Sequence, residues 1–186
     1  MLKFVKFLTI VPFVLLFIGC SKDTTYEYPD DEVVAIVNGE EITIKDLRIL
    51  YNDEQALNRL DATIKATLVM QETERLGLDI SKDVEENIEM RRQLLTKDTE
   101  SEALKANREF AESQAEKFHM EVEDYYEEYV TITANINASM ASYVHEKLGP
   151  PEVESEESIE EYNEKANQLL DELVKEYEDH IDIFIE

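Results

Sequence analysis

The chain is poor in the residues that build turns and cross-links. Its 186 residues include only four glycines, four prolines and one cysteine, and there is no tryptophan. A single cysteine excludes an internal disulfide. Scarce glycine and proline leave few sites for sharp turns, so the composition favours long helices. The length fits one domain plus a tail.

Positive charge is also scarce. Lysine and arginine number 18 against 44 aspartates and glutamates, which gives a formal charge of −26. Such a surface repels nucleic acid and anionic lipid headgroups, so we expect no nucleic-acid partner. The acidic surface has two interpretations: it only keeps a helical protein soluble, or it also attracts cationic partners.

Local motifs of catalysis and cofactor binding are missing from the sequence. It has no Gly-x-Ser-x-Gly turn, no His-Glu-x-x-His pair and no glycine loop that could cradle a phosphate. The acidic run at 121–124 lacks the ligand spacing of a calcium loop. The three histidines, His119, His145 and His180, fall in separate segments, and we expect them at partly exposed helix ends. We therefore predict no enzyme, no cofactor and no metal site. The alternative is an unusual enzyme whose titratable groups converge only in the folded chain.

Residues 1–19 have the features of a secretory signal peptide. Lys3 and Lys6 precede an apolar run that extends from Phe7 to Ile18. A run of about a dozen residues is short for a membrane-spanning helix but fits the apolar core of a signal. We expect this segment to direct the protein out of the cytoplasm.

The end of that segment resembles a bacterial lipobox. Gly19 precedes Cys20, and in a lipobox a small residue precedes the cysteine that is diacylated and becomes the new N-terminus; Phe17 stands where leucine is usual. The resemblance implies lipidation of Cys20, with an uncleaved anchor or a free thiol as alternatives. Residues 20–32 are polar and acidic, which predicts a flexible tether. The expected location is the extracytoplasmic face of the cell membrane, through the lipid anchor.

The stretch after the tether predicts a strand, a turn and a helix. Val33–Val37 is a β-branched apolar run typical of a short buried strand. Asn38-Gly39 supplies the two positive-φ residues of a type I′ turn. Thr43 stands where an N-cap belongs, and Asp46 is placed three residues on to complete a capping box.

A lone strand needs a partner for its backbone groups. The one other good strand candidate is 181–185, where apolar and polar residues alternate at the end of the chain. We therefore predict a mainly α domain over 33–186, with a small β-sheet formed by strands near 33–37 and 181–185. Within it, 149–157 is expected to be an acidic linker and 158–179 the helix that leads to the closing strand.

Helices are predicted over most of the remaining chain. Gly77 and Gly149-Pro150-Pro151 mark two helix ends, and Ser81 and Ser158 are the expected N-caps. Residues 97–107 are compatible with either a loop or a helix. The expected helices span about 44–51, 53–76, 81–95, 104–118, 120–148 and 158–179.

The order of these features resembles the N-terminal chaperone domain of the SurA/PrsA family of extracytoplasmic foldases. VVAIVNGEEITIKDL at 33–47 is similar to a family strand that ends in Val-Asn-Gly and leads through Ile-Thr into helices. The run Gly77-Leu78-Asp79-Ile80-Ser81, followed by Val84, is similar to the segment that joins two later helices of the family. The resemblance covers about 33–90 and, more loosely, 118–148. The family's parvulin isomerase module needs paired histidines and far more chain than lies here, so no isomerase residue is carried over.

Aromatic and thioether side chains concentrate around one predicted helix-loop-helix and are the candidate client-binding residues. Such groups suit a surface that repacks against varied apolar peptides. The alternative is that most of them belong to the core. Two adjacent tyrosines on one helix cannot both face the same core, so at least one of the pair at 125–126 is expected on a rim or groove. The candidates are Phe118, Met120, Tyr125, Tyr126, Tyr129, Met140 and Tyr143.

These observations lead to a function hypothesis. We expect a membrane-anchored, ATP-independent holdase without isomerase activity, which binds unfolded or extended secreted polypeptides. Its helices should enclose a concave apolar surface beside the paired strands. The alternative is an interaction lipoprotein, an adaptor that binds one specific envelope partner.

Overall fold

A computed structural model describes residues 28–96, 102–151 and 155–185. The expected signal peptide, the lipidation site Cys20 and all of the tether up to residue 27 lie outside the described residues, as do the segments 97–101 and 152–154. The fold is mainly helical with a small antiparallel sheet, as predicted.

The sheet joins the two ends of the described chain. Its three strands are β1 (Val33–Val37), β2 (Glu40–Thr43) and β3 (Ile181–Ile183), in the order β2-β1-β3. Asn38 and Gly39 have φ values of 49° and 88°, which fit the type I′ turn between β1 and β2. β1 pairs with β3 in an antiparallel register that sets Ile36 opposite Asp182, so the predicted pairing of 33–37 with the C-terminal strand is confirmed, although β3 ends at Ile183 and not at 185 as predicted.

Helices make up most of the remaining described chain. They are α1 (Ile44–Leu50), α2 (Asp53–Ala56), α3 (Leu60–Arg75), α4 (Ser81–Thr96), α5 (Glu102–Phe118), α6 (Val122–Leu148) and α7 (Glu156–Glu176), with 3₁₀ turns η1 (Leu57–Arg59) and η2 (Glu178–His180). Residues 102–107 are therefore helical, which decides the open alternative for that part of 97–107.

The predicted helix over 53–76 is not continuous in the structure. The stripe over 53–76 predicts a single helix, but the chain forms α2, η1 and α3 in succession. The interruption is at Arg59, whose φ of −103° and ψ of 5° lie outside the helical range. Ala56 and Leu60, on either side of it, are both buried. The break thus belongs to the packing of this corner against the core, since no glycine or proline marks it.

Two predicted caps are shifted. Ser81 is the first residue of α4, and its N–H donates to the Asp79 carboxylate at 3.1 Å, so Asp79 caps this end. α7 starts two residues earlier than predicted because Ser155 forms the capping box with Ser158. The capping box of Thr43 with Asp46 is confirmed.

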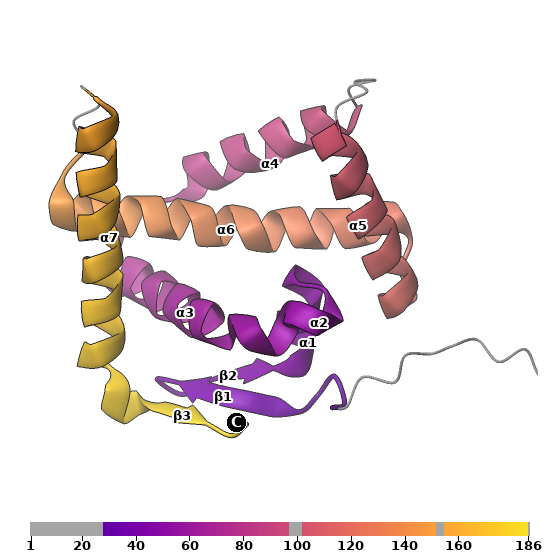
Figure 1. The fold of residues 1–186 in the computed structure, drawn as a ribbon, viewed down its shortest axis with the longest axis horizontal. Helices are drawn as coiled ribbons and strands as arrows, with labels where there is room; N and C mark the ends of the chain where they lie inside the picture. The colour runs from indigo at the N-terminus through magenta and orange to yellow at the C-terminus, as the bar shows by residue number, and fades with distance from the viewer. Residues whose placement is uncertain (1–27, 97–101, 152–154, 186) are drawn as a thin grey trace, which may run out of the picture.

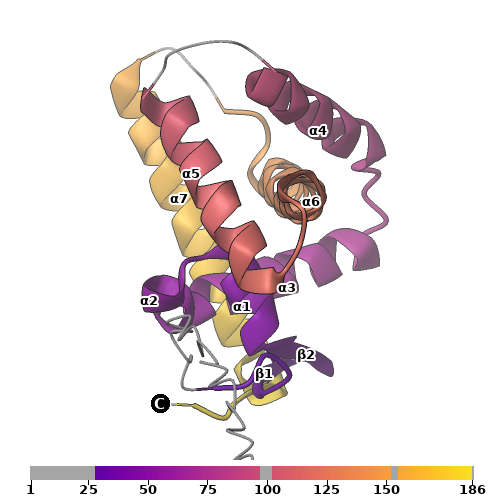
Figure 2. The same cartoon turned by 90° about the vertical axis from the view of Figure 1, so that its right-hand side faces the viewer.

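The elements are arranged in layers above the sheet. In Figure 1 the sheet lies at the bottom, α1 to α3 lie above it, α6 crosses the middle, α4 lies beyond α6, and α5 runs down past one end of α6 toward α1 and α2. Figure 2 shows α6 end-on, with α4 on the side away from the sheet and α5 beside α6. α7 stands along one side of these layers and returns the chain through η2 to β3.

The buried side chains form two clusters. The larger one contains side chains of β1, β2, α1 and α3, together with Tyr143 of α6 and Leu173 of α7. The smaller one contains Ile49, Ala111, Ala115 and Tyr125, where the end of α1 meets α5 and the start of α6. None of the helices in the described part of the chain is long and apolar enough to span a membrane.

Candidate functional site

The structure divides the seven candidate client-binding residues between the two clusters. Met140 and Tyr143 pack with the larger cluster, which includes the sheet. The other five lie in the smaller cluster, where α5 turns into α6; they are Phe118, Met120, Tyr125, Tyr126 and Tyr129. The seven side chains therefore do not form one continuous surface.

Tyr125 is the centre of the smaller cluster. Its ring is fully buried and is stacked against Phe118 and Tyr129, with centroid distances of 6.5 and 6.0 Å. Its hydroxyl donates to the carbonyl of Ile49 at 2.8 Å, and burial raises the pKa of this phenol. Tyr125 thus serves mainly to hold α6 to the end of α1.

A cavity of about 370 Å³ opens between α4, α5 and α6 beside this cluster. Three of the predicted tyrosines, Tyr125, Tyr126 and Tyr129, lie in its wall. As their adjacency predicts, Tyr125 is buried and Tyr126 is only half-buried. Among the described residues, its lining includes Met90, Arg91, Leu104, Asn107, Phe110, Ala111, Tyr125, Tyr126 and Tyr129.

Contacts between aromatic rings hold together the wall that α5 and α6 form, whereas the α4 side of the cavity is more exposed to solvent. Phe110 meets Tyr125 and Tyr129 edge-on, with centroid distances of 6.4 and 5.7 Å. Met90, on the α4 side, is 55% exposed, so its thioether is available at the entrance. Arg91 donates to the hydroxyl of Thr133 at 2.9 Å and accepts at its backbone carbonyl from Tyr126, which ties α4 to α6.

An ion pair adds to this link. Arg92 donates from Nε and from Nη2 to the two carboxylate oxygens of Glu127, at 2.9 and 2.5 Å, in the forked geometry typical of arginine and carboxylate. The hydrogen bond and charge of Arg92 lower the pKa of Glu127, and Glu127 raises that of Arg92. Both side chains are exposed, so the pair contributes little to the stability of the fold. Its main effect is to fix the position of α4 relative to α6.

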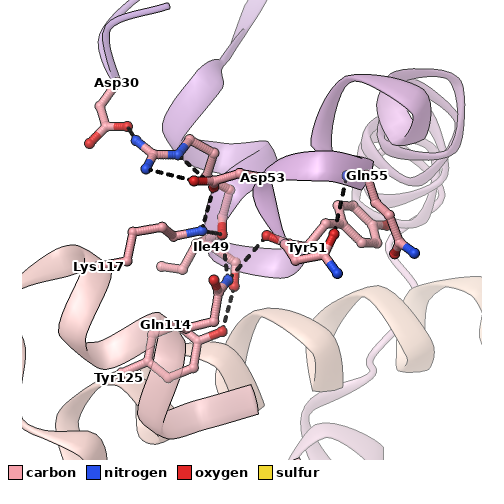
Figure 3. A network of polar contacts seen from close by, with 10 residues as sticks. Asp30, Ile49, Tyr51, Asp53, Gln55, Gln114, Lys117 and Tyr125 are labelled. Carbon is pink, nitrogen blue, oxygen red and sulfur yellow. Dashed lines mark hydrogen bonds and ion pairs between the residues drawn. The ribbon is translucent and has the colours of Figure 1, made fainter. Parts of the chain in front are cut away.

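A partly buried polar network fixes the other side of α5 (Figure 3). Asp53 accepts from Arg48 at 3.0 Å and from Lys117 at 2.8 Å, and Arg48 also pairs with Asp30. Gln114 donates to the backbone carbonyl of Arg48 at 2.6 Å. These contacts join α5 to the α1–α2 corner and hold the cavity wall in place.

Charge and burial oppose each other in this network. Burial disfavours ionised Asp53, yet the hydrogen bonds from Arg48 and Lys117 hold its pKa below the usual value. Burial also lowers the pKa of Lys117, and its bond to Asp53 only partly offsets this. The network therefore connects α5 to the α1–α2 corner, and each charged group in it is paired with a group of opposite charge.

Sequence reasoning missed most of the residues that α4 and α5 contribute to the cavity, notably Met90, Arg91, Leu104 and Phe110. The predicted residues Phe118, Met120, Met140 and Tyr143 do not line it. The cavity lies away from the sheet, across α6 from it, so it is not the concave surface expected beside the paired strands, which stays a prediction.

The cavity offers apolar and aromatic surface with a few polar groups. Arg91 and Asn107 add hydrogen-bonding capacity to a wall of phenyl, phenol and aliphatic groups. His119, His145 and His180 are exposed and are not part of its lining. Within the described residues, no three histidine, cysteine or acidic side chains come together in a way that could hold a metal ion. Such a site can bind apolar side chains.

Comparison of the chain with protein-family models, with curated proteins and with solved structures gives no significant match. The function proposed below therefore depends on the geometry of the site and on the sequence features.

Proposed function

We propose that this protein is an ATP-independent holdase that binds apolar side chains of extended secreted polypeptides in the cavity between α4, α5 and α6. The observation that carries the proposal is the cavity itself. It presents aromatic rings on one side and an exposed methionine at its entrance. Methionine and aromatic side chains adapt to differently shaped apolar partners.

The size of the cavity favours a side chain as its occupant. At about 370 Å³ it is at the small end of the roughly 300–1,000 Å³ found for ligand pockets. One or two apolar side chains of an extended chain fit this space, whereas a folded partner domain does not. Shallow binding of this kind is weak and exchanges fast, which a holdase without an energy source requires.

The acidic surface and the expected anchor support the same proposal. A formal charge of −26 would keep a loaded complex soluble and attract cationic clients. Lipidation at Cys20 and a tether over 20–32 would keep the domain near the membrane where secreted chains emerge. The resemblance to the SurA/PrsA chaperone domain is part of this proposal, and the pairing of the first and last strands is compatible with it.

Suppression of aggregation tests the proposal. A denatured secreted protein is diluted into buffer with this protein at several-fold excess, and light scattering is recorded. We expect suppression by the natural sequence. Met90→Glu places a charge at the cavity entrance, and the amount of protein needed should rise about five- to tenfold, or about 1–1.4 kcal/mol of binding free energy.

The matched control is Leu148→Glu. Leu148 is also an exposed apolar residue, at 37%, but lies at the far end of α6 and does not line the cavity. This variant should suppress aggregation as the natural sequence does. Equal suppression by both variants, or no suppression by the natural sequence, contradicts the proposal.

The alternative function is an adaptor that binds one envelope partner. The small size of the cavity is the observation in its favour, since one anchoring side chain from a single partner would fill it. A photo-crosslinking residue at position 90 in intact cells separates the two functions. Many adducts of different sizes support the holdase, and one dominant adduct supports the adaptor.

A further inference from the structure

The outer edge of β3 is a second feature with binding capacity. In the sheet order β2-β1-β3, β3 is an edge strand, and no segment among the described residues pairs with its outer side. Natural proteins usually protect such an edge with proline, lysine, a bulge or a covering element, because unpaired backbone groups recruit other strands. The described part of β3 carries Asp182 as its one charged residue.

The register of the β1–β3 ladder shows which backbone groups face outward. Asn38 N–H donates to the carbonyl of His180 at 2.8 Å, and Phe184 N–H donates to the carbonyl of Val34 at 3.0 Å. Residues of an antiparallel strand alternate between bonding to the neighbour and facing away from it. The N–H and C=O of Ile183 therefore face away from β1, as does the C=O of Ile181.

Exposed apolar side chains accompany these backbone groups. Ile183 is 49% exposed and Phe184 is 57% exposed, and they are adjacent in the chain. Ile181 and Ile185 pack partly against the larger cluster and hold the strand in place. An added strand would gain both backbone hydrogen bonds and apolar contact here.

We infer that the outer edge of β3 binds an extended cationic segment of a partner polypeptide as a fourth strand of the sheet. Recognition by strand addition uses backbone bonds for affinity and alternate side chains for specificity. The charge of the surroundings selects the occupant: Glu178, Asp179 and Asp182 are all exposed beside or on this strand. A second copy of the chain is disfavoured, because each copy carries a formal charge of −26 and would bring the same acidic residues to the edge.

This inference is independent of the cavity function, since the sheet and the cavity lie on opposite sides of α6. The test uses the intact protein and a ten-residue peptide in which lysine alternates with valine. Amide hydrogen exchange is followed residue by residue. We expect the Ile183 amide to exchange fast in the free protein and at least tenfold more slowly with saturating peptide. A peptide in which glutamate replaces lysine should have no effect.

A substitution that blocks only the outward donor makes the test sharper. Ile183→Pro removes an N–H that makes no bond to β1, so the bonds at His180 and Phe184 are retained, and peptide affinity should fall at least tenfold. Ile183→Thr keeps the N–H and the strand preference and should bind the peptide within about threefold of the natural sequence. If the proline variant does not fold, the hydrogen-exchange experiment on the natural sequence still tests the inference.

Three results would overturn the inference. One is an Ile183 amide already protected in the free protein, with or without a concentration-dependent dimer in sedimentation, which would mean that the edge is occupied without a partner. Another is equal peptide binding by Ile183→Pro and the natural sequence. The third is peptide binding that changes the fluorescence of a tryptophan placed at position 90 while the Ile183 amide stays unprotected, which would assign the peptide to the cavity.

Discussion

At the scale of single residues, Glu72 is the most informative buried charge. It lies on α3 and is almost fully buried, and both oxygens of its carboxylate accept hydrogen bonds. Arg75 donates to it at 2.6 and 2.7 Å, and the hydroxyl of Tyr177 donates at 2.7 Å. Tyr177 follows α7, so this carboxylate links the return of the chain toward β3 to α3. The hydrogen bond from Arg75 lowers the pKa of Glu72.

Glu72→Gln should therefore destabilise the protein in a pH-dependent way. A carboxylate with a lowered pKa in the folded state stabilises the fold above its unfolded value of about 4.3, and this contribution is lost as the pH falls through the folded value. At pH 7 we expect a loss of about 1–2 kcal/mol in the free energy of unfolding. The difference between the natural sequence and the variant should shrink as the pH falls below about 4.3.

Denaturant unfolding at several pH values measures this. Glu74→Gln, at an exposed position two residues further on, serves as the control and should change stability little at any pH. A loss for Glu72→Gln that stays constant down to pH 3 would contradict the assignment.

At the scale of elements, patterns that depend on neighbouring residues were predictable and those that depend on tertiary packing were not. The turn at Asn38-Gly39 and the capping box at Thr43 are written in a few adjacent residues, and both are present. The β1–β3 pairing followed because 33–37 had only one good partner in the sequence. The break at Arg59 carries no local signal, because it depends on how the α2–α3 corner meets the core.

The same reasoning explains the candidate site. Tyr125, Tyr126 and Tyr129 could be predicted as site residues because three aromatic side chains lie within five residues of the sequence. Met90 and Phe110 come from α4 and α5, and only the folded arrangement of three helices brings them to the same cavity. Met140 and Tyr143 follow on the same helix α6, yet they pack with the larger cluster, which includes the sheet. Periodicity identifies an apolar stripe but not its partner.

The joint between the sheet and α1 depends on one cap. Thr43 Oγ1 accepts from the Asp46 N–H at 3.3 Å, and the Asp46 carboxylate accepts from the Thr43 N–H at 2.8 Å. Thr43→Ala should lower the free energy of unfolding by about 1 kcal/mol, measured by urea denaturation. Thr131→Ala, which removes an exposed hydroxyl in the middle of α6, should cost less than half as much. Equal losses would mean that the cap contributes nothing specific.

At the scale of the whole molecule, the excess of negative charge acts on stability. A formal charge of −26 in 186 residues brings self-repulsion that favours expanded chains over the compact state. Salt screens such repulsion, with a Debye length that falls from about 30 Å at 0.01 M to about 3 Å at 1 M. The same salt weakens the exposed Arg92–Glu127 pair, a smaller effect that acts in the opposite direction.

We therefore expect the midpoint of thermal unfolding to rise by a few degrees between 0.02 and 0.5 M sodium chloride at pH 7. Circular dichroism at 222 nm measures it directly, since the described fold is mainly helical. A midpoint that falls with salt would show that ion pairs, and not net repulsion, dominate the electrostatic contribution.

The fluorescence of a single tryptophan at the cavity entrance tests the central claim most directly. The natural chain has no tryptophan, so Met90→Trp gives a signal from that site alone. The variant is titrated with an unfolded polypeptide, reduced and alkylated lactalbumin, in which tryptophan has been replaced or its emission subtracted. Binding of client side chains in the cavity predicts a saturable blue shift, which Tyr126→Glu at the cavity wall weakens about fivefold or more. An unchanged spectrum at a concentration of protein that suppresses aggregation would contradict it.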